Sequence, residues 1–312
     1  MDYDSVLLMA FGGPENREDV RPFLANVFRG SRVPDEQIEE VVERYKAIGG
    51  ASPLNKITFQ QSYDLSSLLK YKKKPLKVYV GMLNWSPNIL SAMEAMKNDG
   101  RKTACGIILA PHKCEIISEW YRFSVLEAQQ ALKFKAPKVV FSGHWHTHPL
   151  FIDAICDCVC GAIGLSSPPS AGEKCKEVDE YEHWVFTAPN IPAEMDADVD
   201  YSGQVFATAR LVAQRFGKHN SHVAYQFRYG QVSDNWLEPD INEKIRELAA
   251  QGAGSVLVIP VSFAADCAEV LYDLDIRAAE GAGREGIKFA RAATVGTGPK
   301  FIEMLSELVT AL

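Results

Sequence analysis

The stretch VLLMAFGGP, residues 6 to 14, decides the fold class of this chain. Its six apolar residues, Val6 to Phe11, end at two glycines and a proline. The run is too short and too uniformly apolar for a surface helix, which predicts a buried strand of a parallel sheet. Similar runs predict further strands at Val78 to Met82, Gly106 to Ala110, Val139 to Ser142, Trp184 to Ala188, Val223 to Gln226 and Val256 to Pro260.

Segments with the apolar spacing of helices separate these strands. They lie at residues 35–48, 115–132, 203–216, 241–251 and 300–312. Alternation of strand and helix along the whole chain predicts an α/β protein built from βαβ units. We expect one domain over 1–115 plus 285–312 and a second over 116–284. A stretch rich in Ser, Pro, Gly and charge predicts a surface loop or insertion at 161–182.

The composition is typical of a globular protein that handles a small molecule. Of 312 residues, 47% are hydrophobic and 23% are charged, which is enough for a core and about two domains. A net charge of -7 offers no basic surface for nucleic acid, and no apolar run approaches the roughly 20 residues of a membrane span. The acidic start is unlike a secretory signal, so we expect a cytoplasmic protein with reduced thiols. The sequence leaves peripheral membrane contact and the oligomeric state open.

Ligands of open parallel sheets bind beyond the carboxyl ends of the strands, and the loops there carry a specific series of motifs. These stretches are LLMAFGGPE (7–15), YKAIGGASPLN (45–55), VGMLNWSP (80–87), LAPH (109–112), HPLFIDAI (148–155), YQFR (225–228), NWLEPD (235–240) and PVSFAADCAEVLYDLDI (260–276). In their order and spacing they resemble the ferrochelatases, which insert Fe(II) into a porphyrin at the end of haem synthesis, along nearly the whole chain. The opening with Ala10 and Phe11 is closer to the coproporphyrin-using bacterial branch.

The resemblance implies two Rossmann-like, chelatase-type domains with a porphyrin cleft between them. Two pyrrole protons leave as iron enters, so a base is needed beside the ring. The family supplies a His in a loop reading roughly F-[ST]-A-H-[ST]-[IL]-P and a Glu in a loop reading roughly S-D-H-x-E-x-L. Glu269 matches the Glu. The porphyrin-binding positions that the resemblance implies are Phe11, Arg29, Ser52, Met82, Trp85 and Arg228.

The catalytic His position is occupied by Pro189. Proline has no side-chain lone pair and no backbone N–H, so it can neither ligate iron nor accept a pyrrole proton. His183 is one candidate replacement, but it lies six residues earlier, about 20 Å away along an extended strand. Phe11 also replaces a tyrosine that many coproporphyrin-type relatives have. Residues that shape the fold remain while residues near the metal differ, which indicates altered chemistry.

Several other side chains are candidate metal ligands. The family often has a line of acids at i+4 spacing; Asp273 continues that line after Glu269, and Arg277 ends it or forms an ion pair with it. His144 and His146 alternate in GHWHTHP and are candidate ligands for a metal or a haem; solvent-facing loop histidines are the alternative.

Four cysteines form the pattern C-x-C-x-C-x14-C, at Cys156, Cys158, Cys160 and Cys175. Some ferrochelatases carry a [2Fe-2S] cluster on four cysteines, so the resemblance makes a cluster a candidate here. On a helix Cys158 would lie nearly opposite Cys156 and Cys160, so a cluster requires the helix to end near Cys156. Buried thiols are the alternative interpretation.

Three functional hypotheses follow. The first is a ferrochelatase with a porphyrin and Fe(II) as substrates, in which Glu269 is the surviving catalytic acid or base. The second is a paralogue that binds porphyrin or haem for storage, transfer or sensing without inserting metal. The third is a chelatase for another metal or another tetrapyrrole. Pro189 makes low or absent insertion activity the expectation, because a positioned base contributes 10² to 10⁴ in rate.

Overall fold

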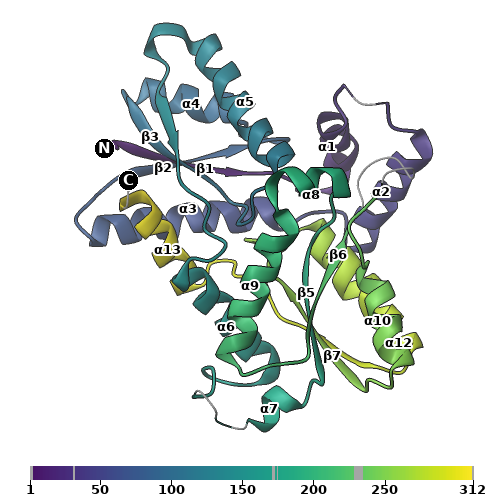
Figure 1. Cartoon of the computed structure of the whole chain (residues 1–312). Helices are drawn as coiled ribbons and strands as arrows, with labels where there is room; N and C mark the ends of the chain where they lie inside the picture. The colour runs from purple at the N-terminus through teal and green to yellow at the C-terminus, as the bar shows by residue number, and fades with distance from the viewer. Residues whose placement is uncertain (1–2, 31, 171–172, 174, 228–234, 311–312) are drawn as a thin grey trace. The chain divides into compact units, whose positions relative to one another are not determined.

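Figure 1 shows the computed structural model of the chain, which describes residues 3–30, 32–170, 173, 175–227 and 235–310. The chain divides into two compact units. Unit 1 comprises Met1–Ala110, Glu115–His144 and Thr297–Leu312, and unit 2 comprises Pro111–Cys114 and Trp145–Gly296. No helix in the described part of the chain is long and apolar enough to cross a membrane.

Unit 1 is a four-stranded parallel sheet in the order β2-β1-β3-β4. Its inner strand β1 is buried at every position, which explains its uninterrupted apolar sequence. The strands are β1 (Ser5–Ala10), β2 (Lys77–Met82), β3 (Thr103–Ile108) and β4 (Lys138–Phe141). The helices are α1 (Val20–Val27), α2 (Asp35–Ala47), α3 (Leu54–Tyr71), α4 (Ile89–Asn98), α5 (Glu115–Leu132) and α13 (Pro299–Thr310), with single 3₁₀ turns at Arg17–Asp19 and Lys133–Lys135.

Helices cover both faces of this sheet (Figure 1). On one face α4 and α5 bury Met93, Met96 and Val125 against β1, β2 and β3. On the other face α3 contacts β2 and α13 packs on α3. Leu65 and Leu69 of α3 are fully buried, and each such side chain contributes roughly 1.5–3 kcal/mol to folding by leaving water.

Unit 2 is a second parallel sheet of the same strand order, β6-β5-β7-β8. Its helices α6 and α9 pack together, and α10 and α12 pack together beside β6 and β8. The strands are β5 (His183–Pro189), β6 (Ser221–Gln226), β7 (Ser255–Pro260) and β8 (Lys288–Arg291). The helices are α6 (Pro149–Ile163), α7 (Lys176–Asp179), α8 (Ala193–Val199), α9 (Tyr201–Arg215), α10 (Ile241–Ala250), α11 (Ala268–Tyr272), a π-helical segment (Asp273–Ala278) and α12 (Ala279–Arg284).

The helix that follows the last strand of each unit in the sequence belongs to the other unit. Helix α6 follows β4 of unit 1 but belongs to unit 2, where it packs on α9. Helix α13 follows β8 of unit 2 but belongs to unit 1, where it packs on α3. The C-terminal helix therefore completes unit 1.

The division differs from the predicted domain boundaries, 1–115 plus 285–312 and 116–284. Helix α5 and β4 lie in unit 1, because β4 pairs with β3 from Thr103↔Lys138 onward. Strand β8, which the sequence did not predict, lies in unit 2 on β7. It has only four residues, KFAR, with a basic residue at each end, so it lacks the apolar run that marked the other strands.

The expected loop at 161–182 begins slightly later than predicted. Helix α6 continues to Ile163 and ends at Gly164, whose left-handed conformation (φ 77°) suits glycine. The four-residue helix α7 interrupts the stretch near its end. The prediction of an α/β protein with two parallel sheets flanked by helices is confirmed.

Candidate functional site

The loop after β1 is held tightly to the start of α3. The Asn55 side chain accepts a hydrogen bond from the Gly13 N–H (3.0 Å) and donates to the Gly13 carbonyl (2.8 Å) and to Glu15 (3.0 Å). Gly12 has φ +84°, and a Cβ there would lie 2.9 Å from the Cβ of Trp85. Only glycine fits this turn, because a side chain there would collide with Trp85. The backbone of the loop therefore lies directly against Trp85.

Aromatic rings gather beside this loop. The ring of Phe23 contacts Phe11, Trp85 and Tyr45 edge to face, with centroids 6.2, 6.1 and 6.1 Å away. Such edge contacts add to the stabilisation that burial gives. Phe11 and Trp85 are only partly buried, so each keeps an accessible apolar surface.

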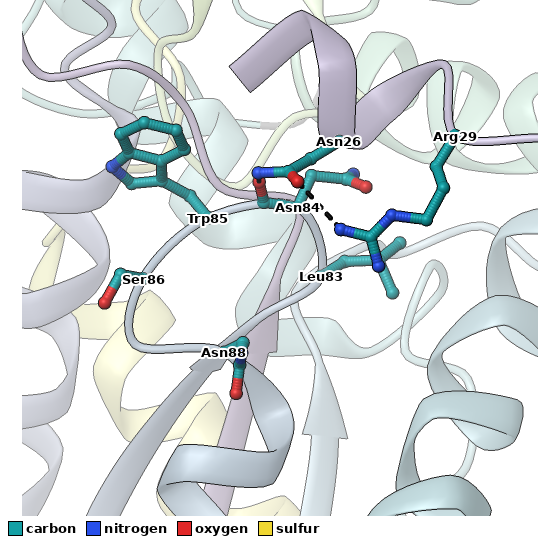
Figure 2. A pocket seen from close by; sticks show the side chains of 7 residues that line it. All are labelled: Asn26, Arg29, Leu83, Asn84, Trp85, Ser86 and Asn88. Carbon is teal, nitrogen blue, oxygen red and sulfur yellow. Dashed lines mark hydrogen bonds between the residues drawn. The ribbon is translucent and has the colours of Figure 1, made fainter. Parts of the chain in front are cut away.

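A pocket of about 310 Å³ lies in unit 1, beside the loop that joins β2 to α4. Figure 2 shows the indole of Trp85 and the guanidinium of Arg29 on either side of Asn84. Arg29 donates to the Asn26 side chain (2.8 Å), and Asn26 donates to the Asn84 carbonyl (3.1 Å). The pocket is lined by Asn26, Arg29, Leu83, Asn84, Trp85, Ser86 and Asn88.

The chemistry of this pocket suits an acceptor ligand. Arg29 is exposed and carries a fork of N–H donors, the group that pairs best with carboxylates. The buried amide nitrogen of Asn84 has no hydrogen-bond partner among the described residues. An unpaired buried donor costs roughly 1–3 kcal/mol, so this nitrogen is a local cost of the fold.

Four predicted porphyrin-binding residues thus lie in the loops of unit 1: Phe11, Arg29, Ser52 and Trp85. Ser52 is buried and lies against Gly13. A Cβ added to Gly13 would be only 2.8 Å from the Cβ of Ser52. The expectation for Met82 is corrected, because its side chain is fully buried in the core with Ala10 and Val80. Met82 supports Trp85 from within and presents no surface to a ligand. Arg228 lies outside the described residues.

In unit 2, Pro189 ends β5 and lies beside Gln226 of β6. The two residues are partners in the parallel register, so their side chains leave the same face of the sheet. The Gln226 amide donates to the Glu269 carbonyl (2.9 Å), and the Asn190 N–H donates to the Gln226 carbonyl (2.7 Å). Gln226 therefore links Pro189 to Glu269.

Three buried polar oxygens near Pro189 have no hydrogen-bond partner in the described part of the chain. They are Thr187 Oγ1, Asn190 Oδ1 and Gln226 Oε1. The side-chain nitrogens of the two amides do have partners. Asn190 donates to the Leu237 carbonyl (3.0 Å), and Gln226 donates to the Glu269 carbonyl. Buried polar groups are nearly always paired, so three unpaired oxygens together mark a departure from ordinary packing at this position.

Glu269 lies in the first turn of α11 and is partly accessible. Its neighbour Cys267 is buried, and burial, followed by the charge of Glu269, raises the pKa of the Cys267 thiol well above its usual value. Cys267 therefore stays protonated and is no thiolate ligand. Glu269 remains the titratable group that accompanies Pro189 and Gln226.

Asp273, the next acid along the helix, is paired rather than available. Its carboxylate is almost completely buried and accepts a hydrogen bond from Arg277 at 3.0 Å. Arg277 thus forms the ion pair that its position predicted. Asp266, just before Cys267, is held by Arg291 (3.2 Å) and Thr294 (3.0 Å).

A buried histidine, His112, is connected to Pro189 by way of Tyr201. The Tyr201 hydroxyl donates to the Pro189 carbonyl (2.9 Å), and its ring contacts His112 edge to face. His112 is hydrogen-bonded to Thr208 (2.9 Å) and Ser262 (2.7 Å), and burial lowers its pKa to about 3. Both ring nitrogens are engaged and the imidazole is neutral, so His112 serves packing rather than proton transfer.

His183, the candidate replacement for a base at position 189, lies far from Pro189 along β5. His183 begins β5 at the end opposite to Pro189 and pairs with His222. His144 is exposed at the end of the unit 1 segment, and His146 is partly buried in unit 2, 5.7 Å from His112 between ring centroids. Within the described ranges no three His, Cys, Asp or Glu side chains are grouped to hold a metal ion. Ligation by His144 or His146 stays a prediction.

The cysteine prediction is corrected. Helix α6 does not end near Cys156 but continues to Ile163, which buries Cys156 and Cys160 and turns Cys158 toward the Thr294 carbonyl. Burial raises the pKa of both Cys156 and Cys158 to about 12, whereas cluster ligands are thiolates. Cys175 contacts Glu177. The structure does not support a [2Fe-2S] site at these four residues.

Sequence analysis did not single out Asn84, Asn190 or Gln226, although Asn84 lies in VGMLNWSP and Gln226 in YQFR. Side-chain amides are common in loops, and only the register of β5 with β6 brings Gln226 beside Pro189. A further signal was their place at the carboxyl ends of predicted strands.

Solved chelatase structures share this fold over the whole chain. The structure of SirB from Bacillus subtilis with Fe3+ matches with a TM-score of 0.56 at 10% identity, covering 99% of this chain and 96% of that one. The sirohydrochlorin chelatase SirB from Bacillus subtilis subspecies spizizenii, in complex with cobalt, also matches with a TM-score of 0.56. The two sheets of this chain therefore have a chelatase-type fold of two Rossmann-like domains.

The sequence narrows this class to one family. The family model Ferrochelatase matches residues 3–312. The ferrochelatase of Rhodopirellula baltica is 37% identical over 308 residues, covering 98% of this chain and 85% of the relative. The coproporphyrin III ferrochelatase of Mycolicibacterium smegmatis is 35% identical over 313 residues, covering 99% and 89%. The chain belongs to the ferrochelatase family.

Proposed function

We propose that this protein inserts Fe(II) into a porphyrin of the coproporphyrin class, slowly, with Glu269 as the catalytic acid or base. The observation that carries the proposal is the hydrogen bond from Gln226 to the Glu269 backbone, which fixes this glutamate in relation to position 189. The reaction converts a free-base porphyrin and Fe²⁺ into the iron porphyrin and two protons. Both protons reach solvent, and Glu269 takes each from the pyrrole nitrogen as iron enters.

The unit 1 loops support binding of a porphyrin with several carboxylates. Phe11 and Trp85 offer flat apolar surface, and the exposed Arg29 offers donors for a propionate. Ser52 lies against Gly13 in the same loop cluster. Relatives whose names specify coproporphyrin III match nearly the whole chain, which supports that substrate class.

Pro189 supports a second candidate, a protein that binds porphyrin or haem without inserting metal. Proline supplies no proton acceptor, and the oxygens of Thr187, Asn190 and Gln226 beside it are neutral and weakly basic. A glutamate alone then carries the acid–base chemistry. A chelatase for another metal is the remaining alternative and has no specific observation in its favour.

One anaerobic experiment separates the first two candidates. Coproporphyrin III is titrated into the protein and followed by fluorescence, and Fe(II) is then added while the Q bands are recorded. The proposal expects saturable binding followed by conversion to the iron porphyrin faster than in protein-free buffer. Binding without such conversion supports the second candidate, and no binding contradicts both.

A further inference from the structure

Two imidazoles meet on unit 2, at the end of its sheet opposite to Pro189 and Glu269. His183 begins the inner strand β5, and His222 lies near the start of the edge strand β6. Their ring nitrogens, Nδ1 of His183 and Nε2 of His222, are 3.0 Å apart. The ring planes are tilted by 37° with centroids 5.2 Å apart.

The strand register explains this contact. Val185 and His222 are partners in the parallel ladder, and His183 lies two residues before Val185 on the same face. His183 and His222 are therefore diagonal neighbours on one side of the sheet. Trp184 and Val185 are fully buried, so the backbone that carries His183 is fixed by core packing.

His183 and His222 are each only partly buried. Lys244 and Glu247 of α10 act electrostatically on His222, but they form an ion pair with each other at 2.5 Å. Glu247 also accepts a hydrogen bond from Gln251 at 3.2 Å. The opposite charges of Lys244 and Glu247 therefore compensate each other beside His222.

The spacing of the two nitrogens fits one metal ion. Imidazole nitrogens that bind a common ion at roughly 2.0–2.1 Å and lie 3.0 Å apart enclose an angle of about 95°. That angle suits square-planar or octahedral coordination, which Cu(II) and Ni(II) prefer, better than tetrahedral coordination. The same two ions stand at the top of the affinity order for nitrogen ligands.

We propose that His183 and His222 form a binding site for a late first-row divalent ion, Ni(II) or Cu(II). The two imidazoles are the protein ligands, and water completes the coordination. A bound ion would replace the hydrogen bond between the rings and connect the edge strand β6 to the inner strand β5. The site is remote from Glu269 within the unit and does not depend on the proposed chelatase activity.

The test is a calorimetric titration of the full-length protein with Ni(II), without porphyrin. His183→Asn and His222→Gln replace each ligating nitrogen by an amide nitrogen or oxygen, a poor ligand for these ions. His219→Asn is the matched control, because His219 is exposed three residues from His222. We expect each ligand variant to weaken the tightest Ni(II) binding at least tenfold and the control to leave it unchanged. Equal binding by all four proteins would overturn the proposal.

A second measurement uses the unaltered protein, in case a variant folds poorly. Nuclear magnetic resonance records the imidazole signals while Cu(II) is added at less than one equivalent. Paramagnetic broadening confined at first to His183 and His222 is the expected result. Broadening that begins at His144, His146 or His148 would assign the ion elsewhere and overturn the proposal.

Discussion

The loop after β1 and the loop after β5 occupy the same topological position but differ in how well their polar groups are satisfied. Each strand lies inside its sheet, next to the second and third strands of its unit. After β1, Asn55 pairs with both backbone groups of Gly13. At the end of β5 and just after it, the side-chain oxygens of Thr187 and Asn190 have no partner in the described residues. The backbone of Gly13 is therefore paired after β1, whereas two buried side-chain oxygens at the end of β5 are not.

Replacing Pro189 tests this contrast with the largest expected effect. Pro189→His places an imidazole beside Gln226 and within reach of the unpaired oxygens. A positioned base is worth 10² to 10⁴ in rate, so we expect Fe(II) insertion to rise about 100-fold. The rate is measured from the Q bands under anaerobic conditions. Pro189→Ala, which removes the proline ring without adding a base, should leave the rate near that of the wild type; an equal rise in both variants would contradict the account.

Two buried threonines of unit 2 offer a matched comparison of stability. Thr187 Oγ1 has no partner, whereas Thr208 Oγ1 bonds His112 (2.9 Å) and the His146 carbonyl (2.9 Å), and both residues are fully buried. Thr187→Val should raise the free energy of unfolding by about 1 kcal/mol, because it removes an unpaired hydroxyl. Thr208→Val should lower it by about 1–3 kcal/mol, because it removes the hydroxyl that pairs with Nε2 of His112 and with the His146 carbonyl. Denaturant unfolding measures both, and changes of the same sign would refute the assignment.

His112 gives unit 2 a specific dependence on pH. Burial, with a smaller contribution from His146, lowers its pKa to about 3, against 6.5 for an ordinary histidine. The unfolded chain then binds a proton below pH 6.5 that the folded chain does not. The stability contribution is complete above pH 6.5 and is lost as pH falls toward 3, by at most about 1.4 kcal/mol per pH unit.

We therefore expect the free energy of unfolding to fall by about 1–2 kcal/mol between pH 7 and pH 5 on account of His112. Urea unfolding at three pH values measures this slope. His112→Gln lacks the titrating group, so its slope should be shallower by that amount. Identical slopes for the variant and the wild type would show that His112 is protonated in the folded state.

Replacing Arg29 tests the unit 1 pocket with the smallest expected effect. Arg29→Ala removes the guanidinium from the unit 1 pocket. Because the side chain is exposed, we expect a loss of about 1 kcal/mol, which raises the KM for coproporphyrin III about fivefold and leaves kcat unchanged. Arg21→Ala is the control. Arg21 is also an exposed arginine near Arg29 in sequence, but it forms an ion pair with Glu39 and does not line the pocket. A fall in kcat instead would place Arg29 in the chemistry.

The sequence predicted the fold well where strands are apolar and buried. Residues 6–11 gave β1 within one residue, and the helix over 115–132 coincides with α5. Strand β8 was missed because edge strands need no apolar face. The exchange of α6 and α13 between the units depends on contacts remote in sequence, so no local pattern signals it.

The candidate site was predictable only in part. Phe11, Arg29, Ser52 and Trp85 came from motif positions, and the structure brings them to the loops of unit 1. The cysteine pattern misled, because the spacing of thiols does not reveal that α6 continues past Cys156. Gln226 was missed because its role comes from the register with Pro189 and a hydrogen bond to Glu269.

The most direct test of the central proposal compares Glu269→Gln with the wild type in one anaerobic insertion assay. Both proteins are saturated with coproporphyrin III, and the rate of Fe(II) insertion and the porphyrin dissociation constant are measured on the same samples. The account predicts that the variant binds the porphyrin as the wild type does and inserts iron no faster than protein-free buffer. An insertion rate equal to that of the wild type would contradict it.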